Sequence, residues 1–395
     1  MAFPSPLAQP PHGSPAAVPP APAARALPVP APPRRGRGAP VWLFAVLTVV
    51  ALGVAAYIVT FLGVAASIVG LVLALIPLVG VLLAVRLVDR WEPEPRSLVV
   101  AAVAWGAVAA VALALLVDLA ISPLVAAAST GAASPLAGEV FSAVIQAPLV
   151  EEVAKGIGVL LILLVGRRAF DGPVDGVVYG ALVGAGFAFT ENILYFATSL
   201  IEGGVGEVTF TFLLRGILSP FAHVMFTAVT GYALGRVARS GAGAGAVLGA
   251  WILGMLGATA LHALWNGSAV LADFFAMYVT LQVPLFVAFV AGVLLLRREE
   301  TRLTRERLGE YAAAGWFSAA EVEMLATPRG RRRAVAWART LPGDRAPAMR
   351  RFIVEATALA TARQRALTGR DSAAADDERI YLARAVDARA ALLSA

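Results

Sequence analysis

The chain has 395 residues, of which 59% are hydrophobic, only 15% are charged and none is cysteine. Soluble domains carry roughly 25% charged residues, so most of this chain is not packed in water. The lack of cysteine excludes disulfides, thiol nucleophiles and thiolate metal sites. The net charge of +6 does not indicate a nucleic-acid partner, because the basic residues lie at the ends of apolar runs and in the C-terminal part.

Residues 1–40 contain 13 of the 25 prolines and show no apolar periodicity, which predicts a disordered tail. Apolar blocks of about 20 residues or more follow, each long enough for a helix to cross a bilayer. We therefore expect an all-α polytopic membrane protein with about eight transmembrane helices. The predicted spans are 41–62, 64–88, 98–121, 140–165, 174–199, 212–236, 244–269 and 273–296.

Arginines mark every second junction between these blocks, and the junctions in between contain no lysine or arginine. By the positive-inside rule, this pattern predicts that both termini are cytoplasmic. Arg215 is the exception, since it lies near a predicted outer helix end. We interpret it as a long side chain that reaches back to the membrane surface.

The composition changes again after the last apolar block, so we divide the chain into the tail, a transmembrane domain at 41–297 and an extension at 298–395. The extension is rich in alanine, arginine and acidic residues and is expected to be soluble, helical and cytoplasmic. Helices are predicted at 304–325 and 346–367. For its arginines we favour a solvated helix surface over contact with anionic lipid.

Ionisable residues in the middle of predicted spans carry the functional signal. A charged side chain at the centre of a bilayer costs about 3 kcal/mol, so such residues are expected to face one another and to mark a site. One of them is the single lysine among the 32 lysines and arginines of the chain. The set is Glu151, Glu152, Lys155, Glu191, His223 and His262.

Spacing predicts how these residues meet. Glu151 and Lys155 are four residues apart and share a helix face, and Glu152 reaches the same lysine from three residues away. At a rise of 1.5 Å per residue, the glutamates and histidines of the four helices lie about 10 to 16 Å below the predicted outer surface. We therefore expect them to converge on one water or one metal ion in the outer half of the membrane.

Two histidines and a carboxylate form a donor set for catalytic zinc, so Glu191, His223 and His262 are the candidate metal ligands. Glu151 or Glu152 then serves as the general base, with Lys155 as its partner and Asn266 as support or oxyanion donor. A metal-free mechanism, in which a glutamate alone activates water, uses the same groups. Both arrangements are suited to peptide hydrolysis.

The chain contains several short motifs: Glu-Glu-x-x-Lys at 151–155, Phe-x-x-x-Glu at 187–191, the histidine at 223, His-x-x-x-Asn at 262–266, and the segments DRWEPEP at 89–95 and DGVVYG at 175–180. Together they resemble the motifs of the PrsW family of intramembrane metalloproteases. The resemblance covers about residues 41–297. Related prenyl-protein endopeptidases have histidine in place of Glu191 and arginine in place of Lys155, and these two residues favour PrsW.

The resemblance implies a multi-pass protein of the bacterial cell membrane that cleaves a membrane-anchored anti-sigma factor on the outer face. The lipid bilayer and this protein substrate are then the expected partners. A proton-coupled transporter is the main alternative, with the glutamates and Lys155 as a proton relay. A non-catalytic scaffold that only binds such substrates is the third interpretation.

Overall fold

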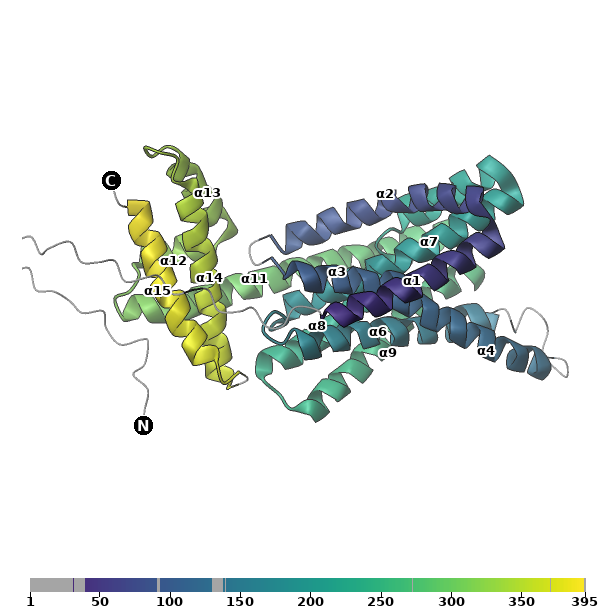
Figure 1. Ribbon diagram of the computed structural model, residues 1–395, viewed down its shortest axis with the longest axis horizontal. Coiled ribbons are helices and arrows are strands. Elements are labelled where there is room, and N and C mark those ends of the chain that lie inside the picture. Colours follow the sequence, from purple (N-terminus) through teal and green to yellow (C-terminus); the bar gives the residue numbers. More distant parts are fainter. Residues whose placement is uncertain are drawn as a thin grey trace, which may run out of the picture. The chain divides into compact units, whose positions relative to one another are not determined.

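The computed structural model describes residues 31, 40–90, 93–129, 138, 140–271, 273–369 and 371–393, and every regular element within them is helical. The predicted all-α polytopic fold is confirmed (Figure 1). The chain divides into two compact units: a membrane unit, Arg35–Leu294, and a helical unit that contains Leu295–Ala395. Apart from Ala31 and Pro40, the predicted tail lies outside the described residues.

The helices of the membrane unit follow the apolar blocks closely. They are α1 (Val41–Leu62), α2 (Val64–Val88), α3 (Arg96–Ala104), η1 (Trp105–Ala110), α4 (Val111–Ser129), η2 (Ser142–Gln146), α6 (Ala147–Val165), α7 (Pro173–Phe212), η3 (Leu213–Leu218), α8 (Ala222–Ser240), α9 (Ala244–Leu271), α10 (Phe274–Met277), η4 (Tyr278–Gln282) and the start of α11 (Val283–Ala313). The η elements are π-helical turns between or beside α-helices.

Six stretches of the described residues are long and apolar enough to cross a membrane. One of them, Pro173–Ser240, runs through two of the predicted spans. The predicted span 140–165 is absent from the six, because α6 contains three charged residues. The expected count of eight therefore stays a prediction.

Two glycines with positive φ interrupt the apolar helices. Gly63 has φ 75° and separates α1 from α2, which confirms the turn that splits this long apolar run. Gly204 has φ 66° and breaks α7 internally. The chain beyond Gly204 runs through the end of α7 into η3 and then α8. This second break therefore sets the direction in which the chain approaches α8.

The central element is α7, which packs against α2, α3, η1 and α8. Its contact with α8 is a backbone contact, since a Cβ on Gly176 would lie 2.0 Å from the Gly231 carbonyl oxygen. The next glycines along α7, Gly180 and Gly184, also meet the α8 backbone, since a Cβ on them would lie 2.6 Å and 2.4 Å from its carbonyl oxygens. These glycines form a ridge of small residues on α7 that lets α8 come close.

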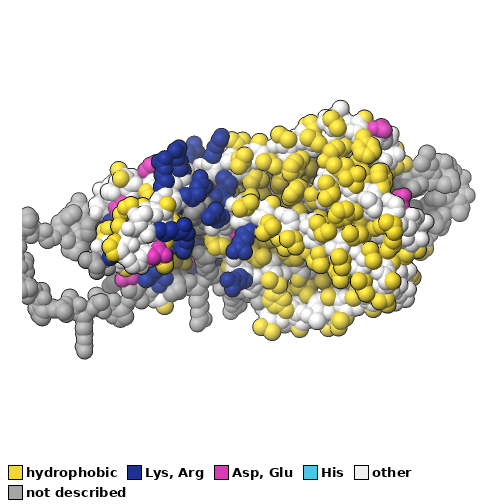
Figure 2. All heavy atoms as spheres, turned by 90° about the horizontal axis from the view of Figure 1, so that it is seen from above, with side chains coloured by type: hydrophobic (Ala, Val, Ile, Leu, Met, Phe, Trp, Pro, Cys, Tyr) yellow, Lys and Arg dark blue, Asp and Glu magenta, His cyan; other side chains and the backbone are white. Residues whose placement is uncertain are grey.

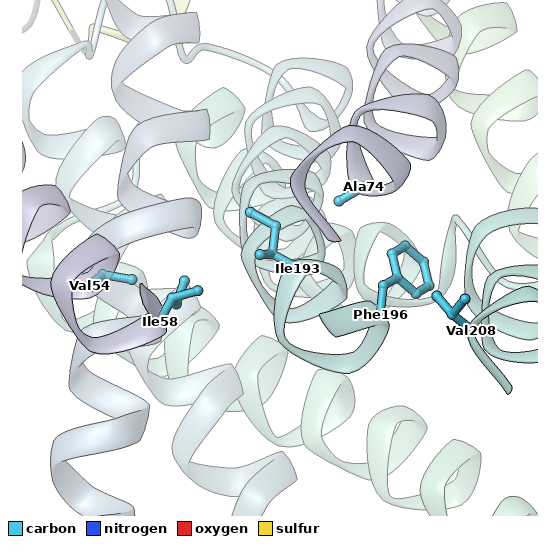
Figure 3. Close-up of a cluster of buried hydrophobic side chains, with 6 residues drawn as sticks. All are labelled: Val54, Ile58, Ala74, Ile193, Phe196 and Val208. Carbon is cyan, nitrogen blue, oxygen red and sulfur yellow. The ribbon is translucent and has the colours of Figure 1, made fainter. Parts of the chain in front are cut away.

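Apolar side chains fill the space where α1, α2 and α7 meet. Ile193 and Phe196 of α7 pack with Val54 and Ile58 of α1 and with Ala74 of α2 (Figure 3). Outside this core, hydrophobic side chains cover most of the face of the membrane unit seen in Figure 2. Such a surface is suited to lipid and not to water.

The helical unit contains the end of α11, α12 (Ala319–Ala326), α13 (Pro328–Arg339), α14 (Ala346–Thr368) and α15 (Ala374–Leu393). The predicted helix at 346–367 agrees with α14. The predicted stretch 304–325 is helical at 304–313 and 319–325 but is not one helix, because Gly315 has φ 85° and Ser318 starts a new helix with a capping box to Glu321.

Candidate active site

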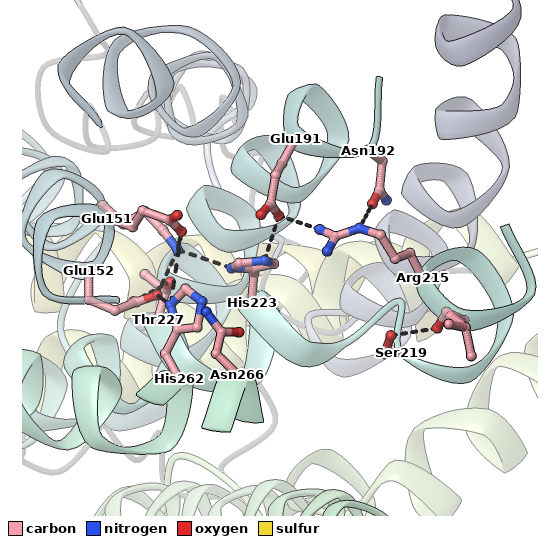
Figure 4. Close-up of polar contacts among 12 residues, drawn as sticks. Glu151, Glu152, Glu191, Asn192, Arg215, Ser219, His223, Thr227, His262 and Asn266 are labelled. Carbon is pink, nitrogen blue, oxygen red and sulfur yellow. Dashed lines mark hydrogen bonds and ion pairs between the residues drawn. The ribbon is translucent and has the colours of Figure 1, made fainter. Parts of the chain in front are cut away.

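Four helices of the membrane unit bring the mid-span polar side chains into one cluster (Figure 4). Its members are Glu151, Glu152 and Lys155 from α6, Glu191 from α7, His223 and Thr227 from α8, and His262 and Asn266 from α9. The convergence expected from spacing and depth is therefore present in the structure.

Lys155 lies at the centre of the cluster and its side chain is fully buried. Its Nζ donates to Glu152 Oε1 at 2.6 Å and to Glu151 Oε2 at 3.3 Å, as the spacing of three and four residues predicts. The same Nζ lies 3.1 Å from Nδ1 of His223 and 3.9 Å from the centre of the Phe187 ring. The single lysine thus contacts three polar groups and one aromatic face.

The two adjacent glutamates differ in their surroundings. The Glu152 side chain has no exposed surface and accepts hydrogen bonds from Lys155 and, at 3.1 Å, from Thr227 Oγ1. Its carboxylate also lies 3.1 Å from Nδ1 of His262. By contrast, the Glu151 side chain is 14% exposed and its contacts are longer, at 3.3 Å to Lys155 Nζ and 3.9 Å to Nδ1 of His262. Glu152 therefore orients its neighbours, and Glu151 faces open space.

Each histidine is oriented by a carboxylate. Nε2 of His223 lies 2.7 Å from Glu191 Oε2, and Nδ1 faces the Lys155 ammonium, which can only donate. His223 therefore carries its proton on Nε2 when neutral. His262 turns Nδ1 toward Glu152, and the two imidazole rings lie 4.9 Å apart. Carboxylate–imidazole pairs of this kind fix the orientation of histidines that bind metals or polarise substrates.

Arg215 belongs to this site, and its interpretation as a side chain reaching for the membrane surface is wrong. Its Nη2 lies 2.5 Å from Glu191 Oε2, and its Nε donates to Asn192 Oδ1 at 2.9 Å. The guanidinium lies 3.9 Å from the centre of the Tyr195 ring. The available signal was an arginine next to a junction, 200–210, that contains no lysine or arginine of its own. Pairing with the mid-span Glu191 explains such an arginine better than a position at the membrane surface does.

Three donors lie close enough together to hold a metal ion: one oxygen of Glu151 and one nitrogen each of His223 and His262, all within 4.8 Å of one another. The donor types fit a divalent ion such as zinc. The predicted set had Glu191 in place of Glu151. In the structure Glu191 is bound by Arg215 and lies outside this group of three.

Asn266 lines the site, but its side chain is hydrogen-bonded to the backbone of a neighbouring element. Its Nδ2 donates to the Ala143 carbonyl oxygen at 2.9 Å, which joins α9 to η2. The amide nitrogen keeps a second N–H. The predicted role in support is compatible with this bond, and the role as oxyanion donor stays a prediction.

The cluster borders two cavities. The larger one has a volume of about 390 Å³ and is lined by both histidines, Asn266 and Arg215, together with apolar side chains such as Trp265. The smaller one, of about 180 Å³, extends between α4, α6 and α7. Glu151 and Glu191 line both cavities. Both carboxylates therefore face open space on two sides.

The model of the family described as PrsW family intramembrane metalloprotease matches residues 94–293. The chain belongs to this family. The expected resemblance is thus confirmed, although α1 and α2 lie outside the matched region. The DRWEPEP and DGVVYG segments meet in the structure, where the hydroxyl of buried Tyr179 donates to Glu94 Oε2 at 2.6 Å.

Three bacterial relatives, each named Protease PrsW, are similar to parts of the chain. The protein of Geobacillus kaustophilus is 32% identical over 150 residues, which is 38% of this chain and 58% of the relative. The protein of Oceanobacillus iheyensis is 34% identical over 23% of this chain and 38% of its own length. The protein of Bacillus subtilis is 34% identical over 25% of this chain and 41% of its own length. The chain therefore spans less than two thirds of these relatives. No solved structure matches it.

Family and fold together identify a bacterial multi-pass membrane protein. The orientation of its termini stays a prediction.

Proposed function

We propose that this protein is an intramembrane endopeptidase that activates water at Glu151 to cleave a membrane-anchored protein. The observation that carries the proposal is a count of charges. Lys155 pairs most closely with Glu152, and Arg215 pairs with Glu191, so Glu151 is the carboxylate left over. In an apolar setting, a surplus carboxylate gains most from accepting a proton or from binding a cation.

In the metal-free form of the reaction, Glu151 takes a proton from a water molecule in the cavity. The resulting hydroxide attacks the peptide carbonyl carbon, and Glu151 then gives the proton to the leaving amine, so that one water is consumed. The second N–H of Asn266 is a candidate donor to the oxyanion, and His262, whose Nδ1 faces Glu152, can donate from Nε2 in its imidazolium form. His223, held by Glu191, borders the same cavity.

The donor set of Glu151, His223 and His262 supports zinc as the cofactor. Zinc bound there would supply a Lewis acid that lowers the pKa of a bound water. Lys155 Nζ contacts Glu151 and Nδ1 of His223, so an ion held by those two groups would take the place of the ammonium beside them. Activity depends on Glu151 in both forms.

The substrate is proposed to be a single-span membrane protein, and the resemblance to PrsW favours an anti-sigma factor. The cut is expected at or just beyond the outer end of the substrate's span, because backbone leaves helical hydrogen bonds more easily near the interface than at mid-bilayer. Mass spectrometry of the new termini measures this position. A cut on the cytoplasmic side would contradict the proposed topology.

The test is reconstitution of the protein in liposomes with candidate single-span substrates. Wild type should cleave, and Glu151→Gln should lose about 10²–10⁴-fold in rate because glutamine cannot accept the proton. Glu202→Gln, an exposed glutamate of α7, is the matched control and should cleave normally. Proton-driven uptake into the same vesicles without cleavage would replace the proposal with a transporter.

A further inference from the structure

One helix of the helical unit differs from the others in its charges. α13 contains five arginines and no acidic residue. Arg331 is buried and donates from Nε to the Leu325 carbonyl oxygen at 2.5 Å. The other four are exposed: Arg329, Arg332, Arg333 and Arg339.

Most arginines elsewhere in this unit have acidic partners. Arg305 pairs with Glu323 at 2.9 Å, and Arg351 pairs with Asp387 at the same distance. Further pairs hold Arg307, Arg363, Arg365, Arg379, Arg384 and Arg389. In the part of the chain that the structure describes, the four exposed arginines of α13 form no such pair. The acidic residues of the unit are therefore used elsewhere, and α13 presents uncompensated positive charge.

The exposed side chains lie on one face. At about 100° per residue, the four arginines, Ala336 and Trp337 fall within an arc of about 160°, opposite the buried positions Ala334 and Ala338. Trp337 is 46% exposed, which is unusual for so large an apolar ring. The α13 face thus combines several arginines with one tryptophan.

In place of the solvated surface favoured from the sequence, we propose that the α13 face binds the anionic headgroups of the bilayer in which the protein resides. Arginine forms paired hydrogen bonds with phosphate, and tryptophan is enriched at the membrane interface, where its ring is apolar and its N–H is polar. The helical unit starts inside α11, at the end of the last predicted span. The chain therefore tethers this unit to the membrane, and lipid headgroups are the anions that it is bound to meet. This inference does not depend on the proposed protease activity.

The cysteine-free chain makes a site-specific test possible. Ala336→Cys in the full-length protein is labelled with an environment-sensitive fluorophore and placed in nanodiscs of phosphatidylcholine, with or without phosphatidylglycerol. With the anionic lipid, the emission should shift to shorter wavelength and be quenched by spin-labelled lipid. Without it, or in 1 M salt, both effects should be lost. The same label at Ala383, an exposed position on α15, should not respond.

Paired charge deletions separate the α13 face from net charge. Arg332→Gln with Arg333→Gln should abolish the response at position 336. Arg305→Gln with Arg379→Gln removes the same charge from two exposed, ion-paired arginines and should leave the response intact. A label indifferent to lipid charge overturns the proposal. So does a response in neutral nanodiscs to added DNA or polyglutamate, which would assign the face to another macromolecule.

Discussion

The membrane unit and the helical unit treat charge in opposite ways. In the membrane unit the mid-span ionisable side chains contact one another, as in the contacts of Lys155 with Glu152 and His223. In the helical unit several ion pairs lie at the surface, and both members of the Arg305–Glu323 pair are about half exposed. Lipid makes an unpartnered charge costly and water does not. Clustered ionisable side chains therefore indicate a functional site in the membrane unit. In the helical unit, the charged side chains that indicate a function are the four exposed arginines of α13, which form no ion pair within the described residues.

The largest expected effect is loss of the metal ion, which should follow from substitution of the histidines of the site and not of a histidine elsewhere in the chain. Purified active protein should contain one zinc ion, and His223→Ala and His262→Ala should each lose it, because each removes one of three donors. His12→Ala, the third histidine of the chain, should retain it. Elemental analysis measures the zinc content. Little zinc in protein that survives a strong chelator would leave Glu151 alone as the activator of water.

The second prediction compares a buried pair with an exposed one. Lys155→Met leaves Glu152 buried without its closest cation and should lower the free energy of unfolding by about 3–5 kcal/mol. Arg351→Met breaks a pair whose members are 42% and 37% exposed and should cost less than about 1 kcal/mol. Unfolding in detergent measures both values. If adding Glu152→Gln restores no stability to Lys155→Met, the pair is not the cause.

The third prediction concerns the arginine that sequence analysis placed at the membrane surface. Arg215→Gln should lower the cleavage rate by about 10–100-fold, because Glu191 then loses the group that orients it toward His223. Glu191→Gln with Arg215→Gln should be no slower than the worse single variant, since the two act through one contact. Independent, multiplicative losses would show that Arg215 acts elsewhere in the cavity.

The smallest expected effect extends the comparison from charge to packing. Gly231→Ala would place a Cβ 1.9 Å from the Gly176 carbonyl oxygen and should cost about 1–3 kcal/mol in unfolding free energy. Gly309→Ala, on the part of α11 in the helical unit, meets nothing within 4 Å and should be neutral or slightly stabilising. Equal effects at both positions would mean that the α7–α8 contact is looser than described.

Helix positions were predictable where an apolar run and a glycine define both ends. The predicted ranges 41–62 and 64–88 coincide with α1 and α2, because Gly63 is the one point in that run where the chain turns. The predicted helix at 304–325 failed as a single helix because it runs through a break. The break lies where Gly315 has positive φ and Ser318 caps the next helix, and both signals, Gly315 and the spacing of Ser318 to Glu321, are present in the sequence.

The candidate site was predictable in membership and less so in its internal arrangement. Depth and spacing bring Glu151, His223 and His262 together without any knowledge of helix packing. They do not distinguish Glu151 from Glu152, since that depends on Thr227 of α8. They also place Arg215 wrongly, because its direction depends on the break at Gly204 and the path of η3.

The backbone contact between α7 and α8 makes these two helices a stiff frame. Glu191 and His223 are attached to opposite sides of a joint with no side chain between Gly176 and Gly231 to compress or rotate. We expect the spacing of these two groups to stay constant while the protein works. Motion is then left to the segment between Gly204 and α8, which contributes Leu214 and Arg215 to the cavity wall. We therefore expect any opening of the cavity to start at the break at Gly204 and to act on Glu191 through Arg215.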